Sequence, residues 1–518
     1  MMTGTLSRVC DRIADSKNPL IILAVIGLTI RLILAPTLTF NIDVGYWTEV
    51  IGVFKNGFGL YGTAGYYYTP IWGYYLGFVS LSLQLLGITD FGTYIPEMAH
   101  LVNSEFKVSS FVTSVQFNTI VKIPLILIDL ATAVLLYKFV YQHTDDKKKA
   151  LLAFSLWIFS PLIITQSSIH GMFDNISAML MLMTMMFAFD RKYFLAGMVY
   201  SFAILTKFFP LFFAFFLIAY VLKKEGIDIN GVKKLTTAII GMTVGAVLVY
   251  IPNIIRGDFW QSFYFIAYRL GLTREMLASI GPVGTAVILA SVIIFIAIVM
   301  FVIVRFGPRF IEKMEEMDEK TRNREVAKFL LFIALILIAI VGIILLIGAM
   351  KNPLGIISMG TKGVALICIF SIFLEIYLGF RMIMEEELNE RKTMTYLFLT
   401  ALSVILWPCA PSYILVVLPF VIIYCTTMDS RYIVPYIILS LALTFQEITA
   451  FMTSPTSMIY AITGNVDVMI PIYEFLALPV IFGIPGSYLL VFTAILGYIS
   501  ILNLSYKWYS EYYRGGKS

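Results

Sequence analysis

The sequence predicts an all-α protein that crosses a membrane many times. Of its 518 residues, 59% are hydrophobic and only 13% are charged, whereas a soluble globular protein carries about 25% charged residues. Apolar stretches of about 18 residues or more recur along the whole chain and are long enough to cross the hydrocarbon core. We expect about fourteen transmembrane helices, because helices satisfy their backbone hydrogen bonds within lipid.

The N-terminal region is expected to start in the cytoplasm and to reach the outer face early. Residues 1–18 are polar and basic, and short basic flanks stay inside. The first span, near residues 20–36, delivers the following segment to the outside. There, residues 46–56 have the spacing of a helix lying on the membrane surface. We interpret residues 70–87 as a re-entrant or surface helix, because a span there would place the lysines at 147–149 outside.

The other predicted spans follow in pairs with short basic turns on the inner side. Most of the 37 Lys and Arg residues then fall inside, which predicts that both termini are cytoplasmic. Long outer segments gather in the first half, so we expect a catalytic module in residues 1–280 and a scaffold with a lipid-donor groove in residues 281–518. The predicted spans lie near residues 117–141, 150–167, 175–189, 193–206, 210–222, 235–252, 283–305, 328–349, 362–380, 394–407, 412–425, 433–451 and 485–506.

Composition argues against several classes of function. The net charge of +5 is a signal of membrane topology and gives no support for nucleic-acid binding. The four cysteines have no CxxC spacing and the three histidines lie far apart, so we expect no metal site. The chain also has no Walker A motif and no Rossmann glycine fingerprint, which argues against a nucleotide-driven pump, and we expect no cofactor.

The outer segment at residues 40–75 is the first candidate for chemistry. It places Asp43 near Trp47 and continues into a glycine-rich tract with several tyrosines, among them Tyr61 and Tyr67. Aromatic rings of this kind sit at the headgroup level or stack on a sugar. A single carboxylate suffices to take the proton of an attacking hydroxyl. The alternative is that Asp43 only caps the helix that follows.

Five cations are candidates for holding a phosphate group. Arg31 and Lys122 lie within predicted spans, where charge is costly and is functional or paired. For Arg31 the alternative is snorkelling to the outer surface, and for Lys122, with Asp129 seven positions later, it is polar contact between helices. The other three, Lys207, Arg256 and Arg269, lie at outer helix ends or in outer segments.

A third candidate is the short outer loop at residues 170–175, HGMFDN. His170 and Asp174 are its potential functional groups. The alternative is structural: Asp174 or Asn175 caps the helix that begins there, and His170 is a satisfied interface residue.

These segments, in their order and spacing, resemble the GT-C superfamily of multi-span glycosyltransferases that use polyprenyl-phosphate sugars. NIDVGYW with the downstream YGTAGYYYTPIWGYY is similar to the first outer loop of GPI mannosyltransferases and of bacterial and archaeal polyprenol-phosphate-mannose enzymes. VKIPLILIDL at 121–130 and SPLIITQSSIHGMFDN at 160–175 resemble the next segments of that family. Lys207-Phe-Phe-Pro210 resembles its Lys-x-x-Pro. The resemblance covers residues 20–270.

The resemblance implies an inverting transferase with Asp43 as the catalytic base. The donor would be a dolichyl- or polyprenyl-phosphate sugar, most often mannose. The acceptor would be a glycan or glycolipid hydroxyl on the non-cytoplasmic face. Asn41-Ile42-Asp43 keeps only the second acid of the family's Asp-x-Asp, which weakens any metal-binding role. The alternative is a lipid-linked-sugar flippase or polysaccharide exporter, for which we would expect charged residues along a path through both halves.

Overall fold

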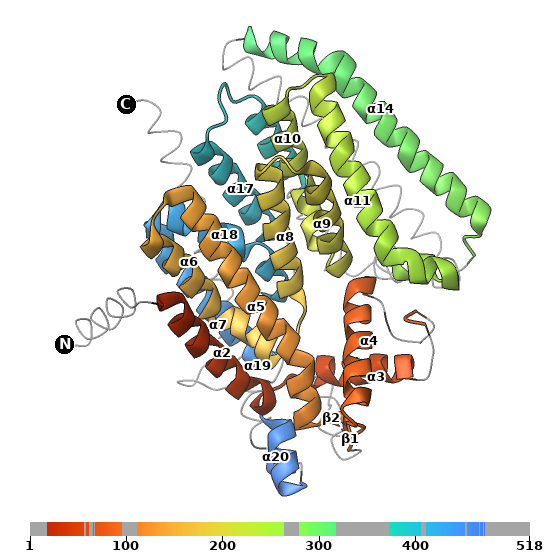
Figure 1. Cartoon of the computed structure of the whole chain (residues 1–518), viewed down its shortest axis with the longest axis vertical. Coiled ribbons are helices and arrows are strands. Elements are labelled where there is room, and N and C mark those ends of the chain that lie inside the picture. Colours follow the sequence, from red (N-terminus) through yellow and green to blue (C-terminus); the bar gives the residue numbers. More distant parts are fainter. Residues whose placement is uncertain are drawn as a thin grey trace, which may run out of the picture. The chain divides into compact units, whose positions relative to one another are not determined.

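The computed structural model describes most of the predicted helical segments. It covers residues 18–55, 59–61, 66, 68–95, 111–263, 279–317, 372–405, 411–450, 453–465, 467–469 and 471. Within these ranges the chain is mainly α-helical (Figure 1). It divides into two compact units. Unit 1 takes its residues from 1–58, 74–182 and 410–518, and unit 2 from 59–73 and 183–409.

Unit 1 combines the first part of the chain with a late part. Its helices α2, α5 and α6 pack on one another, and α18 packs on α5 and α6 (Figure 1). The elements are α2 (Pro19–Thr37), α3 (Asn41–Lys55), most of α4 (Pro70–Leu85), β1 (Gly92–Tyr94), β2 (Phe111–Thr113), α5 (Val115–Thr144), α6 (Lys147–Ile158), α7 (Pro161–Ile164), the π-helix η2 (Thr165–Ile169), the first part of α8 (Asp174–Phe189), η5 (Pro411–Val416), α18 (Leu418–Thr427), η6 (Ser430–Tyr432), α19 (Ile433–Ala450), α20 (Thr456–Thr463) and η7 (Asp467–Met469).

Local sequence explains where the central helices of unit 1 begin and break. The Ser114 hydroxyl accepts a hydrogen bond from the Phe117 amide at the start of α5, and the Asp146 carboxylate caps α6, as expected for N-cap residues. Pro161 lacks an amide donor and interrupts the helix after α6. The resulting bend of 45° leads into α7 and η2, so the predicted span at 150–167 is a broken helix.

A small β-ribbon was not predicted from the sequence. Strands β1 and β2 pair in antiparallel fashion, with Gly92 opposite Thr113 and Tyr94 opposite Phe111. The strands have three residues each, which is too short for a recognisable alternation of apolar and polar residues.

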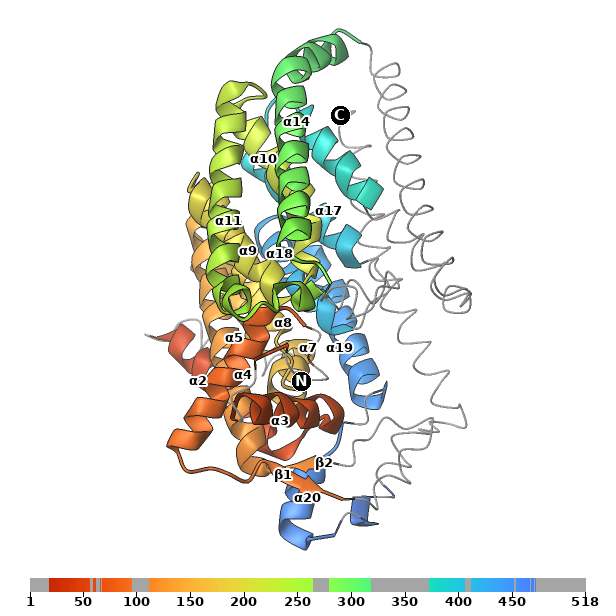
Figure 2. The same cartoon turned by 90° about the vertical axis from the view of Figure 1, so that its right-hand side faces the viewer.

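Unit 2 is built around two closely packed helices, α9 and α11 (Figures 1 and 2). A side chain at Gly197 would overlap the carbonyl group of Ala238, and one at Gly241 would overlap that of Phe194. Small residues at such positions let membrane helices approach closely. The elements are the rest of α8, α9 (Tyr193–Thr206), η3 (Phe209–Phe213), α10 (Ala214–Glu225), α11 (Ile229–Arg256), η4 (Phe259–Phe263), α14 (Pro282–Glu315), a helix at residues 372–383 and α17 (Glu390–Ile405).

The chain is an integral membrane protein. Among the described helices, α2, α5 and α11 are long and apolar enough to cross a membrane, and the bent pair of α6 with the α7–η2 segment is a fourth candidate. Shorter apolar helices occur at α8, α9 and α18. Helix α4 has 16 residues and is not among the candidates. The predicted spans at 328–349 and 485–506 lie outside the described residues.

Candidate functional site

The first candidate residue, Asp43, lies in the first turn of α3. An acid is favoured there because the amino-terminal end of a helix carries partial positive charge. Trp47 follows one turn later and is fully buried, whereas Asp43 is half-buried. Residues four positions apart share a helix face. Helix α3 therefore presents a carboxylate and an indole on one side.

That end of α3 lies against the loop at residues 170–174. The Phe40 and His170 ring centroids are 5.4 Å apart, and those of Trp47 and Phe173 are 6.1 Å apart. Gly171 adopts a positive φ of 67°, and its unoccupied Cβ position is 3.6 Å from a methyl carbon of Val44. The fold thus brings together the two unit 1 segments that the sequence singled out, one with Asp43 and Trp47, the other with His170 and Asp174.

His170 is held by two side chains that sequence reasoning missed. Its Nδ1 is 3.3 Å from a carboxylate oxygen of Glu447, and its Nε2 is 2.6 Å from the Thr453 hydroxyl. All three side chains are buried. A signal was present, because Glu447 is an acid within the predicted span at 433–451, and charge inside a span marks function or pairing.

The segment that carries Thr453 is anchored at several points of unit 1. Ser454 forms an antiparallel bridge with Thr39, just before α3, through backbone hydrogen bonds of 3.0 and 3.1 Å. The Ser457 hydroxyl contacts the Thr113 hydroxyl of β2 at 3.2 Å and accepts from the Asn118 amide of α5 at 2.9 Å. This late segment is therefore fixed next to both parts of the candidate site.

A buried charged network lies beneath the candidate site. The Arg31 guanidinium donates to the Asp129 carboxylate at 3.0 Å, with both side chains fully buried. The same carboxylate accepts from the Ser167 hydroxyl of η2 and, at 2.9 Å, from the Asn175 amide of α8. Snorkelling of Arg31 is thus wrong: its partner is an acid on α5. Asn175 connects helices and does not cap α8, which begins at Asp174.

Lys122 is buried and makes its hydrogen bonds within unit 1. Its ammonium group donates to the carbonyl oxygens of Ala35 and Leu38 at 2.8 Å each, at the end of α2. Ala35 lies in the last turn of α2 and Leu38 is its C-cap, and carbonyl groups at such a helix end lack partners within the helix. The lysine stem also lies below Gly171, whose Cβ position is 3.6 Å from its Cγ. Lys122 therefore joins α5 to α2 and to the 170–174 loop, and it makes no direct pair with Asp129.

The π-helix η2 leads directly into that loop. π-Helical turns are rare and occur frequently at functional sites. Gln166 lies in η2 and is fully buried, and its side-chain amide makes no hydrogen bond to any residue that the structure describes. An unpaired buried amide is costly, so Gln166 joins the candidate residues although no pattern in the sequence identified it.

The second group of predicted residues lies in unit 2, around Lys207. Its ammonium group is 5.8 Å from the centroid of the Tyr68 ring, a distance typical of a cation–π contact. The Thr69 hydroxyl donates to the Thr206 carbonyl oxygen at 2.8 Å, which ties the tyrosine-rich tract to the end of α9. Within that tract, the Tyr61 hydroxyl donates to the Tyr68 carbonyl oxygen at 2.8 Å.

The Arg256 side chain lies beside Gly59, just before the tyrosine-rich tract. The unoccupied Cβ position of Gly59 is 2.9 Å from the Arg256 guanidinium and 3.3 Å from the Asp258 carboxylate. A side chain at Gly59 would require these two flexible side chains to shift slightly. In unit 2, the tract that contains Tyr61 therefore lies near Arg256 at Gly59 and near Lys207 at Tyr68. Tyr67 and Arg269 lie outside the described residues.

The chemistry of both groups is acid–base and electrostatic. In the described part of the chain, no group of three or more His, Cys, Asp or Glu side chains could hold a metal ion. The available parts are a half-buried carboxylate, a histidine oriented by an acid and a hydroxyl, one cation beside an aromatic ring and a second cation beside Gly59. Such groups can move a proton and hold an anionic leaving group.

Comparison with known proteins supports the resemblance predicted from the motifs. Residues 45–281 match the family model of the GPI transamidase subunit PIG-U. A stretch of 92 residues is 29% identical to GPI mannosyltransferase 1 of Saccharomyces cerevisiae, and it covers 18% of this chain and 22% of that protein. The chain resembles GT-C-like membrane glycosyltransferases. Asp43 lies just before the PIG-U match, and Glu447 and Thr453 lie beyond it.

Proposed function

We propose that this protein is an inverting membrane mannosyltransferase. It moves a hexose, mannose, from a dolichyl- or polyprenyl-phosphate donor to a hydroxyl of a glycan or lipid-linked acceptor. The observation that carries the proposal is the packing of α3 against the 170–174 loop, with rings of Trp47 and Phe173 6.1 Å apart. This packing supports one site that contains Asp43, Trp47, His170 and Asp174.

In the proposed reaction, the Asp43 carboxylate takes the proton of the acceptor hydroxyl. The acceptor oxygen then attacks the anomeric carbon from the side opposite the lipid phosphate. The bond between that carbon and the phosphate oxygen breaks, and the lipid phosphate leaves with the electron pair, so the anomeric configuration inverts. One carboxylate is enough for such a single displacement, and the half-buried position of Asp43 leaves it partly accessible.

Binding roles follow from the chemistry of the other candidates. Trp47, Tyr61 and Tyr67 are assigned to the sugar, and His170 and Asp174 to its hydroxyl groups. Lys207, Arg256 and Arg269 are assigned to the donor phosphate, whose charge rises as it leaves. The burial of Lys207 supports its role, because a buried cation stabilises charge more strongly than an exposed one.

The topology in this proposal is the one that the charge pattern favours. It has about fourteen spans, cytoplasmic termini and a site on the outer or lumenal face. Residues 1–280 form the catalytic module, and residues 281–518 supply the scaffold and the donor groove. Glu447 and Thr453 add two side chains from the second part to the site.

The test is transfer of radiolabelled mannose from polyprenyl-phosphate mannose to membrane glycolipids. Asp43→Asn should lower the rate by about 100-fold or more, because the variant cannot accept the proton. Glu49→Gln is the matched control, since Glu49 is an exposed acid on the same helix. Equal rates for wild type and Asp43→Asn would remove Asp43 from the reaction.

A second candidate function is that of a subunit that binds a lipid-linked glycan without catalysing transfer. It is favoured by one observation: the PIG-U match spans residues 45–281, far more of the chain than the mannosyltransferase match. In that case no donor sugar would be transferred, but labelled GPI-type glycolipid would still be retained by the purified protein. A flippase would instead move labelled lipid between leaflets of a vesicle.

A further inference from the structure

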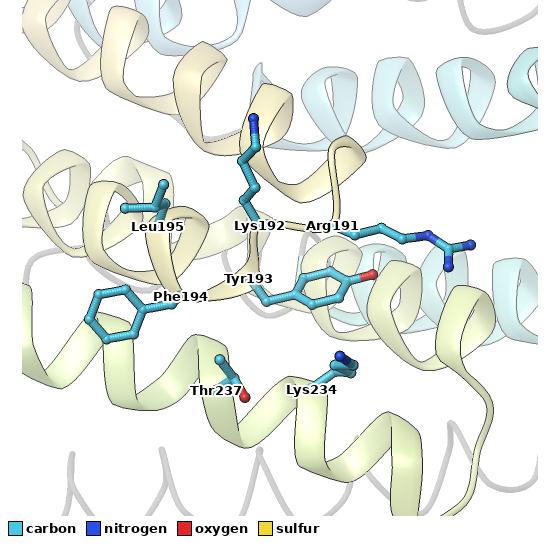
Figure 3. A pocket seen from close by; sticks show the side chains of 7 residues that line it. All are labelled: Arg191, Lys192, Tyr193, Phe194, Leu195, Lys234 and Thr237. Carbon is cyan, nitrogen blue, oxygen red and sulfur yellow. The ribbon is translucent and has the colours of Figure 1, made fainter.

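A basic hollow of about 290 Å³ lies between the α8–α9 turn and the first part of α11 (Figure 3). Its lining combines three cations with a tyrosine, a threonine and two apolar side chains. The lining residues are Arg191, Lys192, Tyr193, Phe194, Leu195, Lys234 and Thr237. The topology predicted from the charge pattern places this end of α9 at the cytoplasmic face, at the opposite end of that helix from Lys207.

The hollow is supported by a rigid part of unit 2. Just beyond it, Gly197 and Gly241 allow α9 and α11 to touch backbone to backbone. The Tyr193 side chain packs with Val221, Leu222 and Leu235 in a buried cluster. The lining residues of α9 and α11 therefore project from two helices in close contact, while Arg191 and Lys192 project from the α8–α9 turn.

Arg191 occupies a position where another residue would be expected. Helix α8 ends in a Schellman motif: the Lys192 amide donates to the Phe187 carbonyl oxygen at 2.8 Å, and the Arg191 amide to that of Ala188 at 3.0 Å. The left-handed position of this motif usually holds glycine, yet Arg191 adopts it with a φ of 58°. Arginine is less favourable than glycine in this left-handed conformation, so the Arg191 backbone is strained at the edge of the hollow.

The charges of the hollow are only partly balanced. Arg191 is 3.5 Å from Glu225, which also accepts from the Tyr193 hydroxyl at 2.7 Å, and Lys192 is 3.0 Å from Asp190. Lys234 makes no ion pair with any residue that the structure describes. The distance from Nε of Arg191 to the Glu225 carboxylate is 3.5 Å, and the Arg191 side chain is 64% exposed, so its guanidinium is accessible to a further anion.

We infer that this hollow binds the phosphate headgroup of an anionic phospholipid in the cytoplasmic leaflet. Figure 3 shows Arg191, Tyr193 and Lys234 on one side of the hollow and Phe194 and Leu195 on the other. The first group suits a phosphate, and the second, which is exposed, suits an acyl chain. Basic pockets between helices on the cytoplasmic side bind phosphorylated headgroups in this way.

The test uses the full chain in nanodiscs of phosphatidylcholine with a minor fraction of phosphatidylglycerol, and native mass spectrometry counts retained phosphatidylglycerol. Lys234→Gln should weaken retention about fivefold, as expected for one cation at a membrane surface. Lys233→Gln is the matched control: Lys233 is the exposed neighbour on α11 and does not line the hollow. Equal losses in the two variants would overturn the inference, since they would report only general surface charge.

Two further measurements probe the guanidinium and distinguish a lipid headgroup from a free anion. Arg191→Gly restores the usual residue of the Schellman motif, so it should fold at least as well as wild type and still lose phosphatidylglycerol. Retention unchanged in Arg191→Gly would contradict the proposed role of the guanidinium.

Inorganic phosphate should not displace the lipid at equal concentration, because it lacks the acyl chains. Displacement by phosphate would identify a site for free anions and overturn the lipid assignment.

Discussion

The buried pair of Arg31 and Asp129 offers the sharpest prediction on stability, because the chain contains an exposed ion pair with the same separation. Both the Arg31–Asp129 and the Lys192–Asp190 pairs have a separation of 3.0 Å. The first has exposed fractions of 0% and 0%, and the second of 54% and 59%. Asp→Asn at each position makes the same chemical change in opposite environments.

The expected magnitudes differ because of desolvation. Asp129→Asn leaves Arg31 charged and buried without its partner, which should cost about 3–5 kcal/mol. Asp190→Asn removes an exposed pair that water screens, so the loss should be about 0–1 kcal/mol. Replacing both buried partners, by Arg31→Met with Asp129→Leu, should recover much of the loss. About 1–3 kcal/mol should remain, because Ser167 and Asn175 lose an acceptor.

The measurement is reversible unfolding of the purified variants in mixed micelles, titrated with SDS and followed by circular dichroism. Wild type, Arg31→Met, Asp129→Leu and the double variant that combines these two substitutions form a thermodynamic cycle. A loss below about 1 kcal/mol for Asp129→Asn would refute the reasoning. Strict additivity of the two buried substitutions would refute it equally, since the charges would then not interact.

Two further predictions concern the late anchor of the site and the packing of unit 2. Glu447→Gln should weaken donor binding about tenfold, seen as a higher KM with little change in kcat, because His170, which is assigned to a sugar hydroxyl, loses the acid that orients it at 3.3 Å; an unchanged KM would make Glu447 purely structural. Gly241→Ala should destabilise the protein by about 1–3 kcal/mol, since its Cβ would overlap the Phe194 carbonyl. Gly52→Ala, in open space on α3, should be neutral or stabilising by up to about 1 kcal/mol. The same SDS titration checks both, and equal effects would contradict the packing argument.

The sequence predicted the helices well, because apolar length and basic turns are local signals. Helices α5, α8, α9, α11 and α19 lie where spans were expected. The break after α6 was missed, although Pro161 is visible in the sequence. The π-helix η2 that follows the break was also missed, because a π-helix has no distinct residue pattern that one sequence reveals.

Partners across long sequence separations could not be predicted. Arg31 was expected to reach the outer surface or a phosphate, but its partner is Asp129, 98 positions away. Both residues have apolar neighbours, and spacing along the chain does not say which helices meet. Glu447 illustrates the same limit: its charge within a span was visible, but its contact with His170 depends on the tertiary fold.

The link between Thr453 and the early helices has a consequence for biosynthesis. His170 and Thr453 are 283 positions apart, and a ribosome adds about 5–20 residues per second. After His170 has been made, tens of seconds therefore pass before Thr453 emerges. During that interval the His170 imidazole lacks Thr453, and the backbone of Thr39 lacks Ser454, in the nascent chain. Insertion factors that shield polar groups within the bilayer should consequently associate with the early helices and leave only when the 453–457 segment arrives.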